Sequence, residues 1–90
     1  MQEPKLYLVG KKGCGACGEI RAKWAANRTR AQYITLGPVY ESIMDATCAQ
    51  YYPFAAVCDT DSAGRFRLPE YYPEMSGEVI EQLENRFREG

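Results

Sequence analysis

Two cysteines stand three positions apart near the start of the chain, in the segment Cys14-Gly15-Ala16-Cys17. A thiolate can attack a disulfide, and a second thiol close by can then form an intramolecular disulfide and release the reduced product. Three-residue spacing at the beginning of a helix places two such thiols about one turn apart. We therefore expect Cys14 to be the exposed attacking thiol and Cys17 to be the more buried resolving thiol.

The residues around this pair favour redox chemistry. Residues 5–10 form a short apolar run, typical of a strand buried on both faces, and the apolar side chains after Cys17 recur at helical spacing. Unpaired N–H groups and the positive end of the dipole at a helix start favour a thiolate over a thiol. Lys11 and Lys12, directly upstream, add positive charge.

The composition excludes several other chemistries. The chain has four cysteines and no histidine, which rules out Cys-His nucleophile activation and mixed Cys/His zinc sites. Its formal net charge of −1 gives no indication of nucleic acid or an anionic membrane as partner. The apolar runs are too short to cross a membrane, and residues 1–5 lack the pattern of a signal peptide. We expect a cytoplasmic protein, in which cysteines serve redox catalysis or metal binding.

The other two cysteines have a different predicted role. Cys48 falls on the expected apolar side of a helix and Cys58 closes an apolar strand, so both are expected to be inert core thiols. The alternative is that they join Cys14 and Cys17 around one zinc ion, although Cys48 and Cys58 lack the close spacing of most closed zinc sites. A zinc-binding or non-enzymatic interaction module thus stays open as the alternative to an enzyme, but we predict no metal ligands.

The hydrophobic pattern predicts one α/β domain over residues 1–90 with the order β-α-β-α-β-β-α. Early alternation of strands and helices implies a parallel pair, and a late hairpin adds antiparallel strands, which gives a mixed four-stranded sheet covered by three helices. The expected strands are residues 5–10, 31–36, 53–58 and 65–68, with a turn at 59–64. The second helix is expected to open at Pro38 and to bury Ile43 and either Cys48 or Tyr51.

The last helix is expected to begin after Ser76, which is a natural N-cap. Its charged residues Glu84 and Arg88 are predicted to face solvent, at the i,i+4 spacing that favours an ion pair. Tyr71 and Tyr72 lie before this helix, and we expect both side chains to be half-buried at the edge of the core.

Pro53 is the first residue of the third predicted strand, where a missing N–H costs a sheet little. Most X–Pro bonds are trans, so trans is the default for the bond between Tyr52 and Pro53. A cis bond would instead leave the backbone of Tyr52 free to pair with an extended substrate. We expect Tyr52 to line a peptide or glutathione groove.

Over nearly its whole length the chain resembles the glutaredoxin branch of the thioredoxin superfamily. The resemblance rests on the strand that leads into Cys14-Gly15-Ala16-Cys17, on residues 52–57, on the turn at 61–64 and on the closing amphipathic helix. It implies a thioredoxin-like fold in which Pro53 is cis and lies beside Cys14. It also implies that the Tyr52 backbone pairs with the cysteinyl part of glutathione or a protein thiol, and that Lys11 meets a glutathione carboxylate.

The chain differs from glutaredoxins at three places. Gly-Ala replaces Pro-Tyr between the cysteines, Tyr-Tyr replaces Thr-Val before Pro53, and residues 75–78 lack the Gly-Gly-acid signature that holds the glutamyl end of glutathione. Ser76 and Gly77, at a helix start, could still offer N–H groups to a carboxylate.

The resemblance implies a monomeric oxidoreductase that reduces protein or glutathione mixed disulfides. It implies no bound cofactor, and glutathione as the expected co-substrate. Thioredoxin reductase is the alternative reductant, as for glutaredoxin-like donors that serve ribonucleotide reductase.

Overall fold

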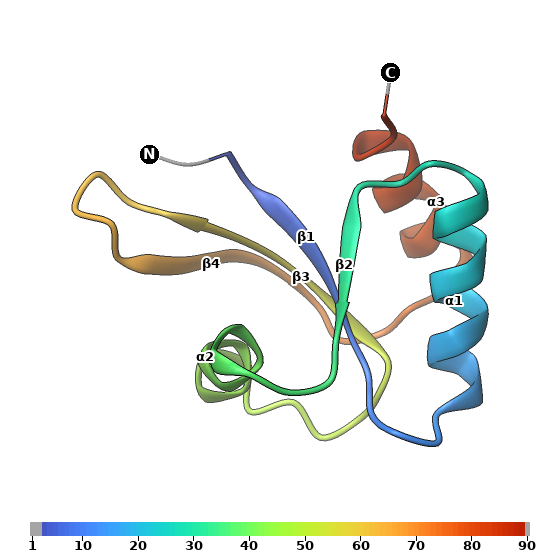
Figure 1. Ribbon diagram of the computed structural model, residues 1–90, viewed down its shortest axis with the longest axis horizontal. Helices are drawn as coiled ribbons and strands as arrows, with labels where there is room; N and C mark the ends of the chain where they lie inside the picture. Colours follow the sequence, from blue (N-terminus) through green and yellow to red (C-terminus); the bar gives the residue numbers. More distant parts are fainter. Residues whose placement is uncertain (1–2, 90) are drawn as a thin grey trace.

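A mixed β-sheet with helices on both faces forms the computed structural model, which describes residues 3–89 (Figure 1). The strand order is β2-β1-β3-β4; β1 and β2 are parallel, and the other two pairs are antiparallel. The predicted element order and the four-stranded mixed sheet with three helices are confirmed. The elements are β1 (Lys5–Val9), α1 (Gly15–Ala26), β2 (Ala31–Ile34), α2 (Pro38–Thr47), β3 (Phe54–Thr60), β4 (Phe66–Tyr72) and α3 (Gly77–Arg86).

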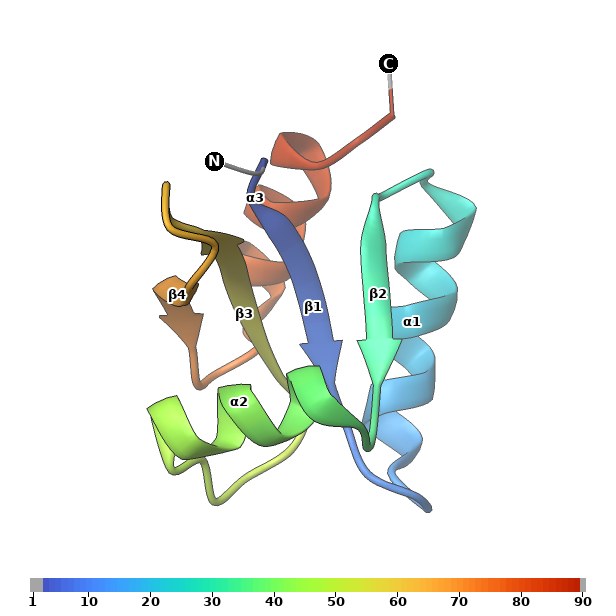
Figure 2. The same ribbon diagram turned by 60° about the vertical axis from the view of Figure 1, so that its left-hand side comes forward.

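Helices α1 and α3 cover one face of the sheet and α2 covers the other (Figures 1 and 2). Side chains alternate between the two faces along a strand. In β1, Leu6 and Leu8 therefore pack with the α1 and α3 layer, while Tyr7 and Val9 pack with the α2 layer. As a result β1 is buried on both faces, as its apolar run predicts. Packing on both faces also fixes the end of β1, which leads into Cys14-Gly15-Ala16-Cys17 (the CxxC segment).

The interface between α1 and α3 contains two hydrogen bonds that join distant parts of the chain. The indole Nε1 of Trp24 donates to the carbonyl of Ile80 at 3.3 Å. The side-chain amide of Asn27 donates to Oε1 of Glu84 at 2.9 Å, and Glu84 is only 6% exposed. The prediction that Glu84 faces solvent is therefore wrong, because a tertiary partner at the end of α1 satisfies its carboxylate. The predicted spacing of Glu84 and Arg88 does give an ion pair, at 3.8 Å.

Helix α2 is shorter than the sequence pattern predicts. It ends at Thr47, because Cys48 adopts a left-handed conformation with φ 53° and forms the C-cap. The residues after the cap leave the helical periodicity, so Cys48 is exposed and Tyr51 is 79% exposed. The expectations that Cys48 is a core thiol and that Cys48 or Tyr51 continues the buried face of α2 are wrong, whereas Ile43 and Cys58 are buried as predicted.

All four strands differ from their predicted bounds. Strand β1 ends one residue earlier than expected, and β3 runs from Phe54 to Thr60, so Asp59 and Thr60 belong to the strand and not to the turn expected at 59–64. Strand β4 continues through Pro69 to Tyr72, where a connecting segment was expected. Proline is tolerated there because β4 is an outer strand of the sheet and pairs with β3 alone among the described strands. Strand β2 ends at Ile34, two residues earlier than predicted. Tyr71 and Tyr72 are half-buried against the two core layers, which confirms their predicted role.

The third helix begins as the sequence predicts, with Ser76 at the N-cap and its Oγ accepting a hydrogen bond from the Val79 N–H. Within residues 3–89, no helix combines the length and apolar character that a membrane-spanning helix requires.

Acidification should weaken the fold through Glu70, whose carboxylate bridges β4 and α3 by accepting two hydrogen bonds of 2.6 Å from the Arg86 guanidinium. These bonds hold the pKa of Glu70 below its ordinary value of 4.5. A lowered folded-state pKa means that the stabilisation is present above the unfolded-state value and is lost as the pH falls through the folded-state value. Both side chains are partly exposed, so we expect Glu70→Gln to lower the free energy of unfolding at pH 7 by about 1 kcal/mol or less.

Urea unfolding at pH 7 and at pH 3 measures this effect. The difference between the wild type and Glu70→Gln should shrink at the lower pH. The matched control is Glu81→Gln, which changes an exposed carboxylate of α3 and should have little effect at either pH. An equal loss of stability at both pH values for Glu70→Gln would contradict the linkage to this ion pair.

Candidate active site

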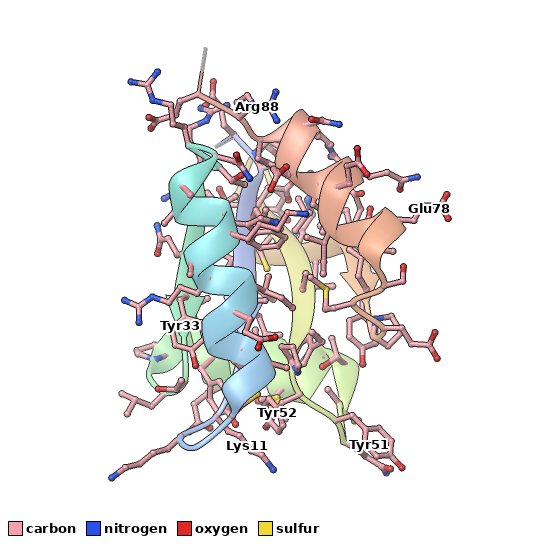
Figure 3. The ribbon with its side chains drawn as sticks, turned by 90° about the vertical axis from the view of Figure 1, so that its right-hand side faces the viewer. Lys11, Tyr33, Tyr51, Tyr52, Glu78 and Arg88 are labelled. Atoms are coloured by element: carbon pink, nitrogen blue, oxygen red, sulfur yellow. A yellow bond between two sulfur atoms is a disulfide. The ribbon has the colours of Figure 1, made fainter. Side chains whose placement is uncertain are left out.

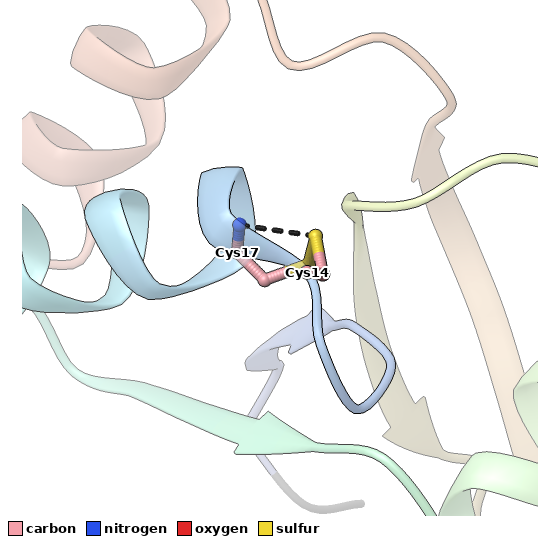
Figure 4. Close-up of a disulfide and its surroundings, with 2 residues drawn as sticks. All are labelled: Cys14 and Cys17. Atoms are coloured by element: carbon pink, nitrogen blue, oxygen red, sulfur yellow. Dashed lines mark hydrogen bonds between the residues drawn. A yellow bond between two sulfur atoms is a disulfide. The ribbon is translucent and has the colours of Figure 1, made fainter.

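The two cysteines of the CxxC segment occupy different environments at the start of α1. Cys14 is the N-cap residue and is partly exposed, whereas Cys17 is 0% exposed. They are joined by a disulfide with a Cα–Cα distance of 5.3 Å, and Sγ of Cys14 accepts a hydrogen bond of 3.2 Å from the Cys17 backbone N–H (Figure 4). The first turn of α1 carries no acidic residue. The predicted contrast in exposure is confirmed. The helix terminus directs an N–H group at Sγ of Cys14, a geometry that favours a thiolate there once the disulfide is reduced.

The connection from β1 to α1 is held by backbone geometry. The N–H of Gly10 donates to the Ile34 carbonyl at 3.1 Å, which extends the parallel pairing with β2 by one residue. Gly13 has φ 84°, a conformation that favours glycine, and the N–H of Cys14 then donates to the Lys11 carbonyl at 3.2 Å. This tight turn places Cys14 at the N-cap of α1.

Gly10 lies directly under the site and has no room for a side chain. A Cβ atom there would lie 2.7 Å from the Tyr33 hydroxyl oxygen and 2.9 Å from Sγ of Cys17. Both atoms therefore approach the same point above the Gly10 backbone. The close approach of β1, β2 and the buried sulfur depends on glycine at this position.

On the β3 side of the site, the peptide bond between Tyr52 and Pro53 is cis, as the resemblance implies. The trans bond expected from the general frequency of X–Pro bonds is therefore wrong here. The Tyr52 hydroxyl is hydrogen-bonded to that of Tyr40 at 2.8 Å, and this bond raises the pKa of Tyr52 above its ordinary value of 10.0. Nζ of Lys11 lies 5.7 Å from the centre of the Tyr52 ring, so the turn before Cys14 and the residue before Pro53 are neighbours (Figure 3).

A cavity of about 380 Å³ connects this side to the start of α3. Ala16 of the CxxC segment lines it together with Tyr52, Pro53 and Ser76. Three of the predicted binding residues therefore share one cavity with the cysteine segment. Gly77 is the first residue of α3 and is not among the residues that line this cavity.

A second cavity, of about 580 Å³, lies beside Cys14 and extends toward the end of β2. We call it the β2-side hollow; Arg21, Tyr33 and Leu36 line it together with Cys14. None of these three residues was predicted to belong to the site. For Tyr33 and Leu36 the available signal was the parallel pairing of the first two predicted strands, because parallel strands end at the same edge of a sheet. For Arg21 it was helical spacing, since Arg21 follows Cys14 by seven residues and so falls on the same side of the predicted helix.

A third cavity, of about 660 Å³, lies at the opposite end of β1 and is lined by Lys5, Thr29 and Phe87, among others, but by no cysteine. Among the described residues, Oγ1 of Thr29 is a buried polar atom without a hydrogen-bond partner. This cavity offers no thiol, so we do not assign it to the redox site.

The four cysteines do not form one cluster. Among residues 3–89, no group of three or more histidine, cysteine, aspartate or glutamate side chains is placed to hold a metal ion. Cys48 lies at the exposed end of α2, and burial together with the nearby charge of Asp59 raises the pKa of the Cys58 thiol to about 11. At neutral pH the Cys58 thiol is therefore protonated and is a weak nucleophile.

These positions define the chemistry available at the site. Cys14 is partly exposed and lines the β2-side hollow, and its sulfur is bonded to that of the buried Cys17. The site can therefore exchange between a disulfide and a dithiol through attack at Cys14. Comparisons with protein-family models, curated proteins and solved structures give no match to this chain.

Gly10→Ala should destabilise the protein by about 1–3 kcal/mol, since the new Cβ would overlap the Tyr33 ring and Sγ of Cys17. The matched control is Gly18→Ala on the exposed side of α1, where an added Cβ has no neighbour within 4 Å. This control should be neutral or stabilising, because alanine favours a helix over glycine. Urea unfolding of both variants tests the comparison, and wild-type stability in Gly10→Ala would contradict the close approach at this position.

Proposed function

We propose that this chain is a thiol–disulfide oxidoreductase with a thioredoxin-like fold that acts as a glutaredoxin-like electron donor. It would reduce protein disulfides or glutathione mixed disulfides through Cys14 and Cys17. The observation that carries the proposal is the placement of this pair: a partly exposed cysteine at the N-terminus of α1 is bonded to a fully buried one in its first turn. A helix start that stabilises a thiolate, next to a thiol that can displace the product, suits disulfide reduction.

The reaction transfers two electrons to the substrate in two exchange steps. The Cys14 thiolate first attacks one sulfur of the substrate disulfide, so that this S–S bond breaks and the other substrate sulfur leaves as a thiolate that takes a proton. The Cys17 thiol then loses its proton and its sulfur attacks Sγ of Cys14. A bond between Cys14 and Cys17 forms, the mixed disulfide breaks, and the second substrate sulfur leaves as a thiol. Two thiols of glutathione, or a reductase, restore the dithiol.

The fold assignment is supported by how the elements surround this pair. The cysteines follow the central strand β1, and the cis bond at Pro53 begins the neighbouring strand β3. Tyr52, Pro53 and Ser76 share a cavity with Ala16 of the CxxC segment, and Lys11 lies over the Tyr52 ring. These residues, with the N–H groups at the start of α3 at Ser76 and Gly77, would bind the substrate or glutathione. Glutathione and thioredoxin reductase are both compatible with this arrangement as reductants.

Replacing either cysteine should separate their roles. We expect Cys14→Ser to lower disulfide reduction by more than about a thousandfold, because it removes the attacking sulfur. Cys17→Ser should retain only monothiol reactions that depend on glutathione, since it cannot close the intramolecular disulfide. Both variants are made in a Cys48→Ser background so that the exposed thiol of Cys48 does not contribute. Full dithiol turnover in Cys14→Ser would disprove the assignment.

The reductant can be identified by following NADPH oxidation with a small disulfide substrate. One reaction contains glutathione and glutathione reductase, and the other contains thioredoxin reductase. We expect turnover in at least one of them. Turnover with glutathione would make Ser76→Ala and Lys11→Gln the next variants to test for an increased KM for glutathione, and no turnover in either reaction would contradict the proposed activity.

A further inference from the structure

The β2-side hollow next to Cys14 has a positive lining. Its ten lining residues include Lys11, Lys12 and Arg21 but no aspartate or glutamate. The ammonium group of Lys11 lies over the Tyr52 ring, on the other side of the CxxC segment. The positive charges left for the hollow are therefore those of Lys12 and Arg21, in a chain whose formal net charge is −1.

These two charges are available to a ligand. Neither Lys12 nor Arg21 forms an ion pair with any residue that the structure describes, whereas Arg86 and Arg88 are paired with carboxylates. The Arg21 guanidinium lies 5.0 Å from the centre of the Tyr33 ring, a cation–π contact that holds it at the wall of the hollow. A guanidinium held in this way keeps its N–H donors for an incoming carboxylate.

An exposed apolar side chain lines the cavity on each side of the CxxC segment. Three large apolar side chains are strongly exposed in the described part of the chain: Leu36 at 78%, Tyr51 at 79% and Phe66 at 40%. Leu36 lines the β2-side hollow, and Tyr51 lines the cavity near Pro53. Figure 3 shows Tyr33 on one side of the start of α1 and Tyr51 and Tyr52 on the other. Leu36 therefore gives the β2-side hollow an exposed apolar contact beside the charges of Lys12 and Arg21.

We propose that the β2-side hollow is a substrate subsite for a polypeptide, and that it binds an acidic side chain close to the cysteine that Cys14 attacks. The inference rests on the proposed function, since it names the substrate class for the same sulfur. Arg21 and Lys12 would bind the carboxylate, and an apolar side chain of the same segment would cover Leu36. Glutathione carries no apolar side chain for Leu36, so a polypeptide suits the hollow better.

Electrostatic complementarity of this kind raises specificity and the rate of association more than affinity, and salt screens it. The effect should therefore appear in kcat/KM and should depend on ionic strength. The probes are disulfide-linked peptides of equal length that carry Glu, Gln or Lys two residues from the cysteine, on one side or the other. At low salt the Glu peptide should react about tenfold faster than the Gln peptide, and the Lys peptide more slowly than both.

Three variants make the test specific to the hollow. Arg21→Gln should remove most of the preference for Glu over Gln, and Arg21→Lys should restore part of it. The matched control is Lys23→Gln, which removes an exposed positive charge of α1 that does not line the hollow and should leave the preference unchanged. In the wild type the preference should also fall as salt is raised to about 0.5 M.

The outcomes separate this inference from the proposed function. Equal rates with the Glu and Gln peptides, or a preference that survives in Arg21→Gln, would overturn the subsite while reduction itself stands. If Arg21→Gln slows a small glutathione mixed disulfide as much as the Glu peptide, the hollow belongs to glutathione and the polypeptide assignment is wrong. No reduction of any peptide or of a small neutral disulfide would instead disprove the proposed function.

Discussion

Burial of β1 on both faces is the constraint on which the rest of the structure depends. Leu6 and Leu8 face one helix layer and Tyr7 and Val9 face the other, so a shift of one residue would exchange the two sets. The register of the central strand is therefore fixed by packing, and with it the point at which the chain leaves the sheet at Gly10. The turn that follows is short, so the position of Cys14 at the start of α1 is set by the core rather than by a flexible loop.

The same constraint explains why the two sulfurs differ. Cys17 faces the core from the first turn of α1, close to Gly10 and the Tyr33 ring, whereas Cys14 caps the helix at the surface. Their backbones are rigidly related through one helical turn. The difference in access between the two sulfurs is thus a property of the fold, and a reaction that begins at Cys14 and ends at Cys17 requires no large movement of the chain.

Local patterns predicted the features that depend on near neighbours in sequence. The apolar run of β1, the cysteines at a helix start, the cap at Ser76 and the buried Cys58 all follow from composition and spacing. The features that failed or were missed depend on conformation or tertiary contacts. Cys48 is exposed because it adopts a left-handed conformation, and Glu84 is buried because Asn27 hydrogen-bonds to it. Tyr33 and Leu36 line the site because β2 pairs in parallel with β1 and ends at the same edge of the sheet.

Strand β4 is an outer strand of the sheet, and its backbone limits pairing with other copies of the molecule. As the outer strand beside β3, it presents one side of its backbone to solvent, where a further strand could add. Pro69 removes one N–H from β4, and the pairing with β3 shifts between Val57 and Asp59. A missing donor and an irregular register both oppose edge-to-edge growth of the sheet. Strand β4 therefore opposes aggregation through its own free edge.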